Sequence, residues 1–206
     1  MKILLATSNH GKVKEIKDFY KNYEILALNE ILALNEILEP FEIAETGKSF
    51  KENAIIKSQT VAKKINLDEF IVLSDDSGIS VDIFNKMPGI YSARFSGENA
   101  TDKTNRAKLI SMLKEKNIKK TSAFYTACIA ITTKFGTFST HGFMYGDVID
   151  EERGQNGFGY DFMFIPKGFN QTTAELPLDV KLEISHRSNG LKLMQIILEN
   201  LKKYYK

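Results

Sequence analysis

Short apolar runs recur along the chain, and each ends in a polar or glycine-containing segment. Apolar runs of about four to eight residues are typical of strands. We interpret seven runs in this way: residues 2–6, 23–28, 70–74, 79–84, 122–133, 137–145 and 162–165. Because only a short glycine-containing turn separates residues 122–133 from residues 137–145, these two predict an antiparallel pair.

Between the apolar runs, apolar residues three and four positions apart predict helices. Val13, Ile16 and Phe19 show this spacing directly after the first strand and its polar turn. Strand, turn and helix in this order form the opening unit of a parallel sheet. Further helices are predicted near residues 29–38, 46–65, 99–113 and 191–201. Ser49, followed three residues later by Glu52, has the spacing of a capping box at the start of one of them.

A hexapeptide is duplicated near the N-terminus, where residues 25–30 are repeated at once as residues 31–36. A repeat of six residues matches neither the 3.6-residue helical turn nor the coiled-coil heptad. Two copies are also too few for a repeat array. We therefore interpret the duplication as a peripheral insertion without a part in the chemistry.

Composition and charge narrow the class of protein. The chain has 206 residues and a formal net charge of +2, which predicts no strong binding to nucleic acid or to an anionic membrane. Its single cysteine, Cys128, excludes a disulfide framework and a cysteine-based zinc site. No apolar run reaches the ~20 residues of a membrane span, and the N-terminal run is too short for a signal peptide. We expect one cytoplasmic α/β domain covering residues 1–206.

The polar turn after the first strand is the first candidate site. It reads Thr7-Ser-Asn-His-Gly-Lys12 and leads directly into a predicted helix. Backbone N–H groups at a helix N-terminus, together with a lysine, can hold an anion. The spacing is not that of a P-loop, and the turn taken alone favours an ordinary strand-to-helix connection with a capping residue.

Asp75-Asp76-Ser77-Gly78 follows a buried strand and is the second candidate. Two neighbouring acids at a strand end repel each other unless a cation neutralises them, and Mg²⁺ binds such carboxylates together with phosphate oxygens. Since adjacent residues of an extended chain point to opposite faces, only one of the two should reach a given site. The alternative is a turn with solvated carboxylates.

Two later segments and one distant pair complete the candidates. Gly157-Phe-Gly-Tyr-Asp161 combines flexible glycines with aromatic rings that can stack on a planar base. Ser185-His-Arg-Ser188 offers directional donors, but the same residues suit a simple helix cap. Glu45 and Lys57 are twelve residues apart, and neither is informative alone.

Other chemistries lack support in the sequence. The three histidines, His10, His141 and His186, share no metal-ligand spacing. Cys128 lies in an apolar run, where a buried inert thiol is expected, and no serine has the Gly-x-Ser-x-Gly context of acyl transfer. The residues alone thus indicate a magnesium-dependent enzyme that acts on a phosphorylated, ring-bearing ligand.

Taken together, these segments resemble the inosine triphosphate pyrophosphatase family. The matching stretches occur in the family's order over nearly the whole chain: residues 6–12 with Glu15, residues 45–47 with 52–54, residues 75–78, 88–97, 157–161 and 185–187. The resemblance implies a long, twisted mixed sheet flanked by helices, in two lobes around a central cleft. It further implies a homodimer that hydrolyses ITP, dITP and XTP to the monophosphate and pyrophosphate.

The same resemblance implies roles for individual residues. Glu45 and Asp76 would hold Mg²⁺, and Asp76 would also be the catalytic proton acceptor. Purine nucleotide would be bound by two groups of residues. The residues that would bind the triphosphate are Thr7, Ser8, Asn9, His10, Gly11, Lys12 and Lys57, with Ser77 beside Asp76. The base group is Phe158, Gly159, Tyr160, Asp161, Lys181, His186 and Arg187, of which the last three would read the 6-oxo group.

Two alternatives and two departures from the family pattern accompany this prediction. A pyrophosphatase for pyrimidine or other damaged triphosphates would share the motifs, and so would a nucleotide sensor without turnover. Ser8 stands where glycine is frequent in the family, and Phe162 stands where proline is frequent. Serine in place of glycine at position 8 affects how closely the backbone can approach a phosphate. Phenylalanine in place of proline at position 162 affects the shape of the base pocket.

Overall fold

The computed structural model describes residues 2–28 and 43–205. The helix expected near residues 29–38 and the second copy of the hexapeptide lie outside this part of the chain. Glu45, which the resemblance assigns to the metal, is within it.

Six strands form one mixed sheet in the order β2-β1-β3-β4-β5-β6. Their bounds are β1 Lys2–Leu5, β2 Glu24–Ala27, β3 Phe70–Val81, β4 Lys120–Thr133, β5 Gly136–Ile149 and β6 Phe164–Pro166. β1 is parallel to both β2 and β3, whereas β5 and β6 are antiparallel. β4 and β5 are joined by a two-residue turn, a connection that only antiparallel neighbours allow. The mixed sheet with flanking helices agrees with the predicted fold class.

Five α-helices accompany the strands in the described residues: α1 His10–Phe19, α3 Phe50–Ala62, α4 Asp102–Glu115, α5 Leu178–Ile184 and α6 His186–Leu201. Short 3₁₀ turns cover Asp82–Phe84, Gly89–Arg94, Asp161–Met163, Thr173–Glu175 and Lys202–Tyr204. None of the helices in residues 2–28 and 43–205 has the length and apolar character that a membrane span requires.

The chain divides into two compact units. Unit 1 comprises Met1–Asp76, Ala127–Gly142 and Arg187–Lys206, and unit 2 comprises Ser77–Thr126 and Phe143–His186. β3, β4 and β5 each contribute residues to both units.

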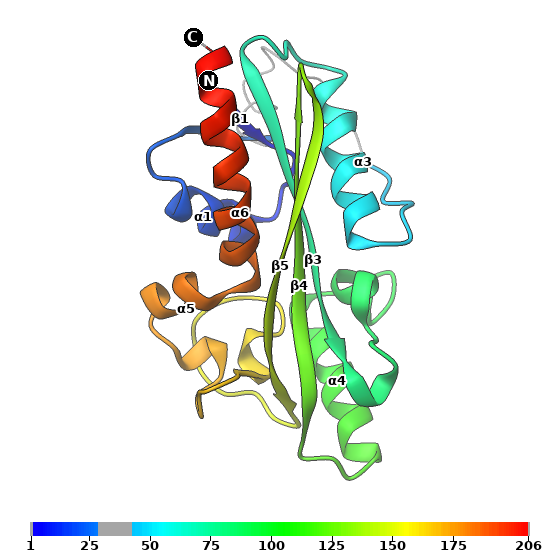
Figure 1. The fold of residues 1–206 in the computed structure, drawn as a ribbon. Coiled ribbons are helices and arrows are strands. Elements are labelled where there is room, and N and C mark those ends of the chain that lie inside the picture. The colour runs from blue at the N-terminus through cyan, green and yellow to red at the C-terminus, as the bar shows by residue number, and fades with distance from the viewer. Residues whose placement is uncertain (1, 29–42, 206) are drawn as a thin grey trace. The chain divides into compact units, whose positions relative to one another are not determined.

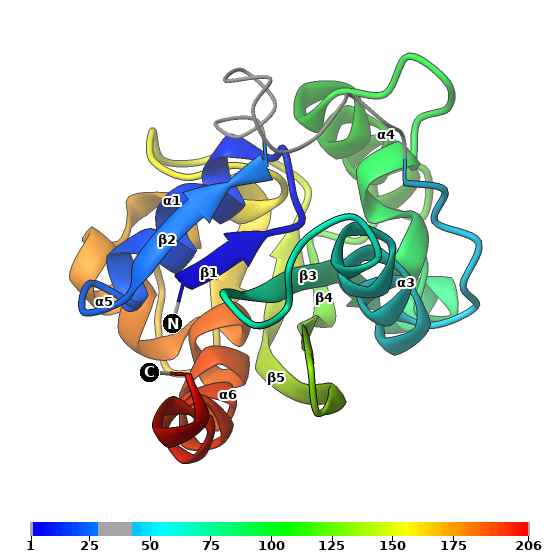
Figure 2. The same ribbon diagram turned by 90° about the horizontal axis from the view of Figure 1, so that it is seen from above.

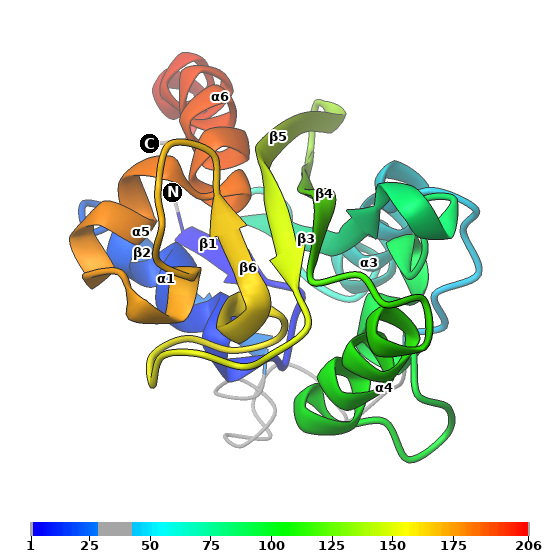
Figure 3. The same cartoon turned by 90° about the horizontal axis from the view of Figure 1, so that it is seen from below.

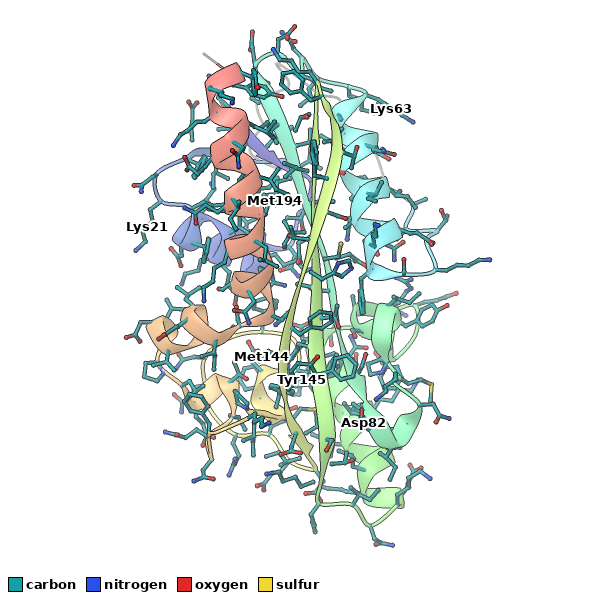
Figure 4. The ribbon with its side chains drawn as sticks, viewed as in Figure 1. Lys21, Lys63, Asp82, Met144, Tyr145 and Met194 are labelled. Carbon is teal, nitrogen blue, oxygen red and sulfur yellow. The ribbon has the colours of Figure 1, made fainter. Side chains whose placement is uncertain are left out.

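In unit 1, helices cover both faces of the strands (Figures 1 and 2). α1 and α6 pack on one face through Ile16, Leu191 and Met194, all of which are buried, and Figure 4 shows Met194 directed from α6 toward the strands. The Tyr20 hydroxyl donates to the Leu191 carbonyl at 2.7 Å and joins the two helices. α3 covers the other face, where Val61 and its neighbours form a separate apolar cluster with β1 and β3.

In unit 2, α4 packs on one side of the strands and the segment that carries β6 and α5 lies on the other (Figure 3). Leu109 and Leu113 of α4 are fully buried, as are Met163 just before β6 and Phe164 at its start. Thr101 caps α4 by accepting from the Thr104 N–H group, and its own backbone is capped in return by the Thr104 hydroxyl. The predicted helix start near residues 99–102 is therefore confirmed.

Several predicted boundaries were wrong. β3 continues without a break through the Asp75-Asp76-Ser77-Gly78 segment to Val81, so the two acids lie inside a strand instead of after it. Residues 82–84 form a 3₁₀ turn instead of the end of a strand. Residues 162–163 also belong to a 3₁₀ turn, so β6 begins at Phe164.

Two helix starts, those of α1 and α6, were predicted too late. α1 begins at His10, and α6 begins at His186, five residues before the predicted start. His186 and Arg187 are thus in the first turn of α6 and not in a loop before it. For α3, the capping box is only half present: Ser49 accepts from the Glu52 N–H group, but the Glu52 carboxylate accepts from Lys48 N–H.

Candidate active site

The polar turn after β1 forms an exposed helix N-terminus in unit 1. β1 pairs with β3 so that Leu5 lies opposite Leu73, and the Ala6 N–H donates to the Leu73 carbonyl at 2.7 Å. This register places the turn beside the two acids of β3. Asn9 caps α1 by accepting from the Lys12 N–H at 3.0 Å, and the first turn of α1 holds no acidic residue. Such an end attracts anions because its N–H groups point outward.

Lys57 links Glu45 to Asp76. Its ammonium lies 3.2 Å from Glu45 Oε1 and 2.7 Å from Asp76 Oδ1. The Lys57 and Asp76 side chains are each 9% exposed, whereas that of Glu45 is 33% exposed. The Ser74 hydroxyl donates to the Ala54 carbonyl at 2.6 Å, which fixes α3 against β3 one turn before Lys57. The structure thus brings together three side chains that are distant in the sequence, two of which, Glu45 and Asp76, the family resemblance assigns to one metal ion.

Burial and charge act in opposite directions on this pair. Burial works to lower the pKa of the Lys57 ammonium, but the carboxylates of Asp76 and Glu45 outweigh it and raise that pKa. Burial raises the pKa of the Asp76 carboxyl, and the attraction of Lys57 only partly offsets the effect. A carboxylate whose pKa is raised in this way is a better proton acceptor than a solvated one.

Asp75 points away from Asp76 to the opposite face of β3. Its Oδ2 atom lies 2.7 Å from the Lys12 ammonium and 3.2 Å from Arg187 Nη2. Asp75 therefore faces α1 and α6, while Asp76 faces Lys57 of α3. The sequence prediction that neighbouring acids of an extended chain serve different partners is confirmed.

Arg187 is almost fully buried and bridges two carboxylates. Its Nη1 atom donates to Glu15 Oε2, and its Nη2 atom to Asp75 Oδ2. Burial acts against the charge of Arg187, but Asp75 and Glu15 raise its pKa further above the ordinary value. The same contact lowers the pKa of Asp75: Arg187 and Lys12 outweigh the burial of that carboxyl.

Of the seven residues predicted to bind the base, all except Arg187 lie in unit 2, where Asp161 contacts two of them. Its Oδ2 atom accepts from the Lys181 ammonium at 2.7 Å and from the Phe158 N–H at 3.0 Å. The Lys181 ammonium also lies 5.0 Å from the centroid of the Phe158 ring. Gly157 has φ +94°, and a Cβ atom there would lie 2.3 Å from Asp161 Oδ2. This turn therefore requires glycine at position 157, where the Asp161 carboxylate accepts from the next backbone N–H group.

Three further predicted base or substrate residues also lie in unit 2. The Tyr160 hydroxyl donates to the Ser92 carbonyl at 2.9 Å, so it serves the packing of the turn. His186 stacks on Tyr125 with ring centroids 4.5 Å apart and planes 10° apart. Ser77, half-buried, directly follows Asp76 in β3.

Sequence reasoning missed two residues that shape these groups. Arg106 of α4 donates through Nη1 to the Gly159 carbonyl at 2.7 Å and stacks over the Phe162 ring at 4.4 Å. Asp102 at the start of α4 accepts from the Gly159 N–H at 2.8 Å. Both lie in an ordinary helix pattern, so only their contacts with the glycine turn identify them.

Two other kinds of chemistry were considered for the described residues: a metal centre formed by clustered side chains, and a reactive cysteine. No group of three or more histidine, cysteine, aspartate or glutamate side chains in that part of the chain could hold a metal on its own. Cys128 is fully buried, and burial raises the pKa of its thiol to about 12. The predicted burial of Cys128 is therefore confirmed, and its lack of reactivity stays a prediction.

A surface pocket of about 540 Å³ in unit 2 is lined by none of the predicted site residues. Asp82 and Tyr145, labelled in Figure 4, are among its lining residues. Two of its lysines, Lys86 and Lys120, pair with Asp82 and Asp147.

Comparison with known proteins decides the family. A sequence model described as the Ham1 family matches residues 3–196. The chain belongs to the Ham1 family. Among its Ham1 relatives, a dITP/XTP pyrophosphatase of Campylobacter fetus subsp. fetus is 62% identical, with 100% of both chains covered. One from Campylobacter jejuni subsp. jejuni serotype O:2 is 52% identical, with 98% of this chain and 100% of that one covered.

Solved Ham1 structures have the same fold. The Ham1 protein of Staphylococcus aureus is 35% identical, with a TM-score of 0.80 and coverage of 97% of this chain and 99% of that one. A HAM1 protein from Coxiella burnetii is 33% identical, with a TM-score of 0.81 and the same two coverages. The family resemblance and the fold class predicted from the sequence motifs are thus confirmed.

Proposed function

We propose that this Ham1-family chain hydrolyses non-standard purine nucleoside triphosphates, dITP, XTP and ITP among them, to the monophosphate and pyrophosphate. The observation that carries the proposal is full-length identity of 62% to a relative named dITP/XTP pyrophosphatase. The structure supports the proposal because two acids, Asp75 and Asp76, lie beside an exposed helix N-terminus in unit 1.

The triphosphate is assigned to the start of α1. Thr7, Ser8, Asn9, His10, Gly11 and Lys12 offer N–H groups, hydroxyls and an ammonium at a helix end, which together suit a polyanion. Burial, despite the opposing charge of Asp75, lowers the pKa of the Lys12 ammonium from its ordinary value. Lys57 adds a second cation, close enough for its charge to contribute to the lowered pKa of Lys12.

A divalent metal fits the carboxylates of Glu45 and Asp76. Their oxygens already share one cation, the Lys57 ammonium. Asp76 Oδ2 is buried and has no hydrogen-bond partner among residues 2–28 and 43–205. A buried carboxylate oxygen without a donor is costly unless a cation approaches it. Hard oxygen ligands, few in number and next to phosphate, favour Mg²⁺, which would withdraw charge from the phosphate oxygens when bound.

Asp76 is assigned the role of proton acceptor. We infer that its carboxylate orients a water molecule and takes a proton from it as the water attacks the α-phosphorus. The bond from the α-phosphorus to the bridging oxygen breaks, and pyrophosphate leaves. Lys57, which contacts Asp76, stabilises the charge that develops on the phosphate oxygens. Ser77 lies next to Asp76 in the chain and is assigned to substrate binding.

The base is assigned to unit 2. Phe158 offers a ring for stacking, Gly159 and Tyr160 shape the turn, and Lys181 and His186 offer donors for a 6-oxo group. Adenine carries an amino group at that position, so these donors would be left unpaired, at about 1–3 kcal/mol each. Arg187 is assigned to the same 6-oxo group, although its guanidinium is already held by Glu15 and Asp75 in unit 1.

We also propose a homodimer that acts in the cytoplasm on the free nucleotide pool. The exposed rings of Phe143 and Tyr145, stacked 6.2 Å apart on β5, are of the kind that a second subunit covers. Light scattering coupled to gel filtration should give twice the chain mass of 23.3 kDa. A mass of one chain would contradict the dimer.

Pyrophosphate release from a panel of triphosphates tests the activity. With Mg²⁺ present, dITP, XTP and ITP should be hydrolysed with kcat/KM at least about 100-fold above dATP, dGTP and dUTP. Chelation with EDTA should abolish the reaction. A preference for dUTP would favour the alternative of a pyrimidine pyrophosphatase. Binding without turnover would favour a nucleotide sensor. The buried acids argue against a sensor, because a protein that only binds polyanions gains nothing from buried carboxylates.

A further inference from the structure

Lys12 and Glu15 lie three residues apart on α1 and therefore share one face of that helix. The proposed function uses Lys12 and leaves Glu15 without a role. Yet the Glu15 side chain is buried and contacts Arg187, which is 172 positions away in the sequence. The helix begins within residues 7–12, the polar turn assigned to the triphosphate and called the triphosphate turn from here on. A buried acid on this helix calls for an explanation.

The four side chains form one linked arrangement within unit 1. Asp75 Oδ2 accepts from both Lys12 and Arg187, and the Asp75 carbonyl lies 3.4 Å from the Lys12 ammonium as well. Arg187 in turn forks onto Asp75 and Glu15. The connected order is Glu15, Arg187, Asp75, Lys12, and it joins α1, α6 and β3.

We propose that Asp75 and Glu15 are positioning residues for Lys12: Asp75 holds the Lys12 ammonium at the triphosphate turn, and Glu15 fixes Asp75 through Arg187. The inference rests on the proposed function, because it assigns Lys12 to the triphosphate. Neither acid contacts the substrate. Arg187 gains a role that is independent of the base.

The chemistry of the two cations explains why such an arrangement is useful. A lysine carries its charge on a flexible four-carbon stem, and ordering that stem on binding costs affinity. Asp75 fixes the stem before the substrate arrives. Because one carboxylate oxygen serves two cations, its direction depends on Arg187. The planar guanidinium fixes that direction only while Glu15 holds its other edge.

Burial of these charges argues for a functional purpose. Asp75 is fully buried and the Arg187 side chain is 3% exposed. Apolar residues of similar volume would stabilise the fold at least as well as buried ion pairs. An arrangement of four charges that ends at the triphosphate turn is better explained by orientation of Lys12.

The Glu15→Gln variant tests the inference, with Asp18→Asn on the same helix as the matched control. Affinity for inorganic triphosphate, a ligand without a base, is measured by calorimetry at constant Mg²⁺. Loss of the charge at Glu15 should weaken that affinity about tenfold. The KM for dITP should rise equally while kcat changes less than about threefold, since Lys12 binds substrate and transition state alike. Asp18→Asn should change none of these values.

The double variant with Lys12→Met separates positioning from a general structural effect. If Glu15 acts through Lys12, Glu15→Gln should add almost nothing to the loss caused by Lys12→Met. Full additivity, or unchanged affinity of Glu15→Gln for inorganic triphosphate, would overturn the inference.

Arg187→Lys covers the case in which Glu15→Gln fails to fold. It keeps the charge but cannot fork onto two carboxylates, so the same loss of affinity for inorganic triphosphate is expected. An effect confined to dITP would instead assign Arg187 to the base alone and overturn the inference. Calorimetry also separates this result from failure of the proposed function, which would show as wild-type protein that binds inorganic triphosphate but cleaves no purine triphosphate.

Discussion

The Lys57 ammonium lies 2.7 Å from Asp76 Oδ1, and both side chains are 9% exposed. The contact joins α3 to the middle of β3, within unit 1. A buried pair of this kind contributes little net stability, because desolvation of the two charges consumes most of their attraction. We therefore expect the pair to serve the reaction, which needs both a carboxylate and a cation beside the phosphates.

Asp76→Asn should lower kcat for dITP by at least about 100-fold, because an amide cannot accept a proton from water. The side chain keeps its size, so affinity for dITP should change by less than about fivefold. Stopped assays of pyrophosphate release and equilibrium binding measure the two effects. Asp68→Asn, an exposed acid of unit 1, is the control and should retain full activity. Unchanged turnover in Asp76→Asn would remove Asp76 from its assigned role.

Lys57→Met should destabilise the fold by about 3 kcal/mol, because it leaves the Asp76 charge buried without its partner. Most of that loss should return in the double variant Lys57→Met/Asp76→Asn, in which no charge remains. Urea denaturation followed by circular dichroism measures both. At the exposed pair of Lys134 with Asp68, the matched change Lys134→Met should cost less than about 1 kcal/mol. Equal costs at the two lysines would contradict the interpretation.

The strands of the fold were largely predictable because their apolar runs are continuous. Leu4 and Val72 lie in such runs and are fully buried in β1 and β3. The uninterrupted course of β3 was not predictable, since its two acids resemble a turn until their partners Lys57 and Arg187 are known. Tertiary ion pairs override the local pattern here. The early start of α6 has a similar cause, because Arg187 is polar yet buried by contacts with distant acids.

The candidate site was predictable only in part from the residues. The helix N-terminus at Asn9 and the glycine turn at Phe158 have local signatures. Glu45 and Lys57 have none, and only the family resemblance brought them forward. Glu15 shows the limit most clearly: its contact with Arg187 spans 172 positions, and no pattern in a single sequence encodes such a pair.

Phe158→Ala should raise the KM for dITP about tenfold, because stacking on a base contributes roughly 1–3 kcal/mol. Affinity for inorganic triphosphate should stay unchanged, since that ligand has no base to stack. Phe138→Ala, at a partly exposed ring of unit 1, serves as the control and should alter neither value. A loss of affinity for both ligands in Phe158→Ala would show that the change disturbs more than base binding.

Cys128 should not react with a thiol reagent such as 5,5′-dithiobis(2-nitrobenzoate) in the native protein at pH 8. Burial raises the pKa of its thiol to about 12, so the reactive thiolate is scarce at that pH, and the side chain is fully buried. In guanidinium chloride, one thiol per chain should react at once. Rapid reaction of the native protein would contradict the buried position in β4.

Hydrolysis of dITP in water enriched in ¹⁸O tests the central claim most directly, because it locates the phosphorus that water attacks. Mass spectrometry of the products should find one ¹⁸O atom in the deoxyinosine monophosphate and none in the pyrophosphate. Label in the pyrophosphate, or release of inorganic phosphate in place of pyrophosphate, would contradict attack at the α-phosphorus and with it the assignment of unit 1 to that chemistry.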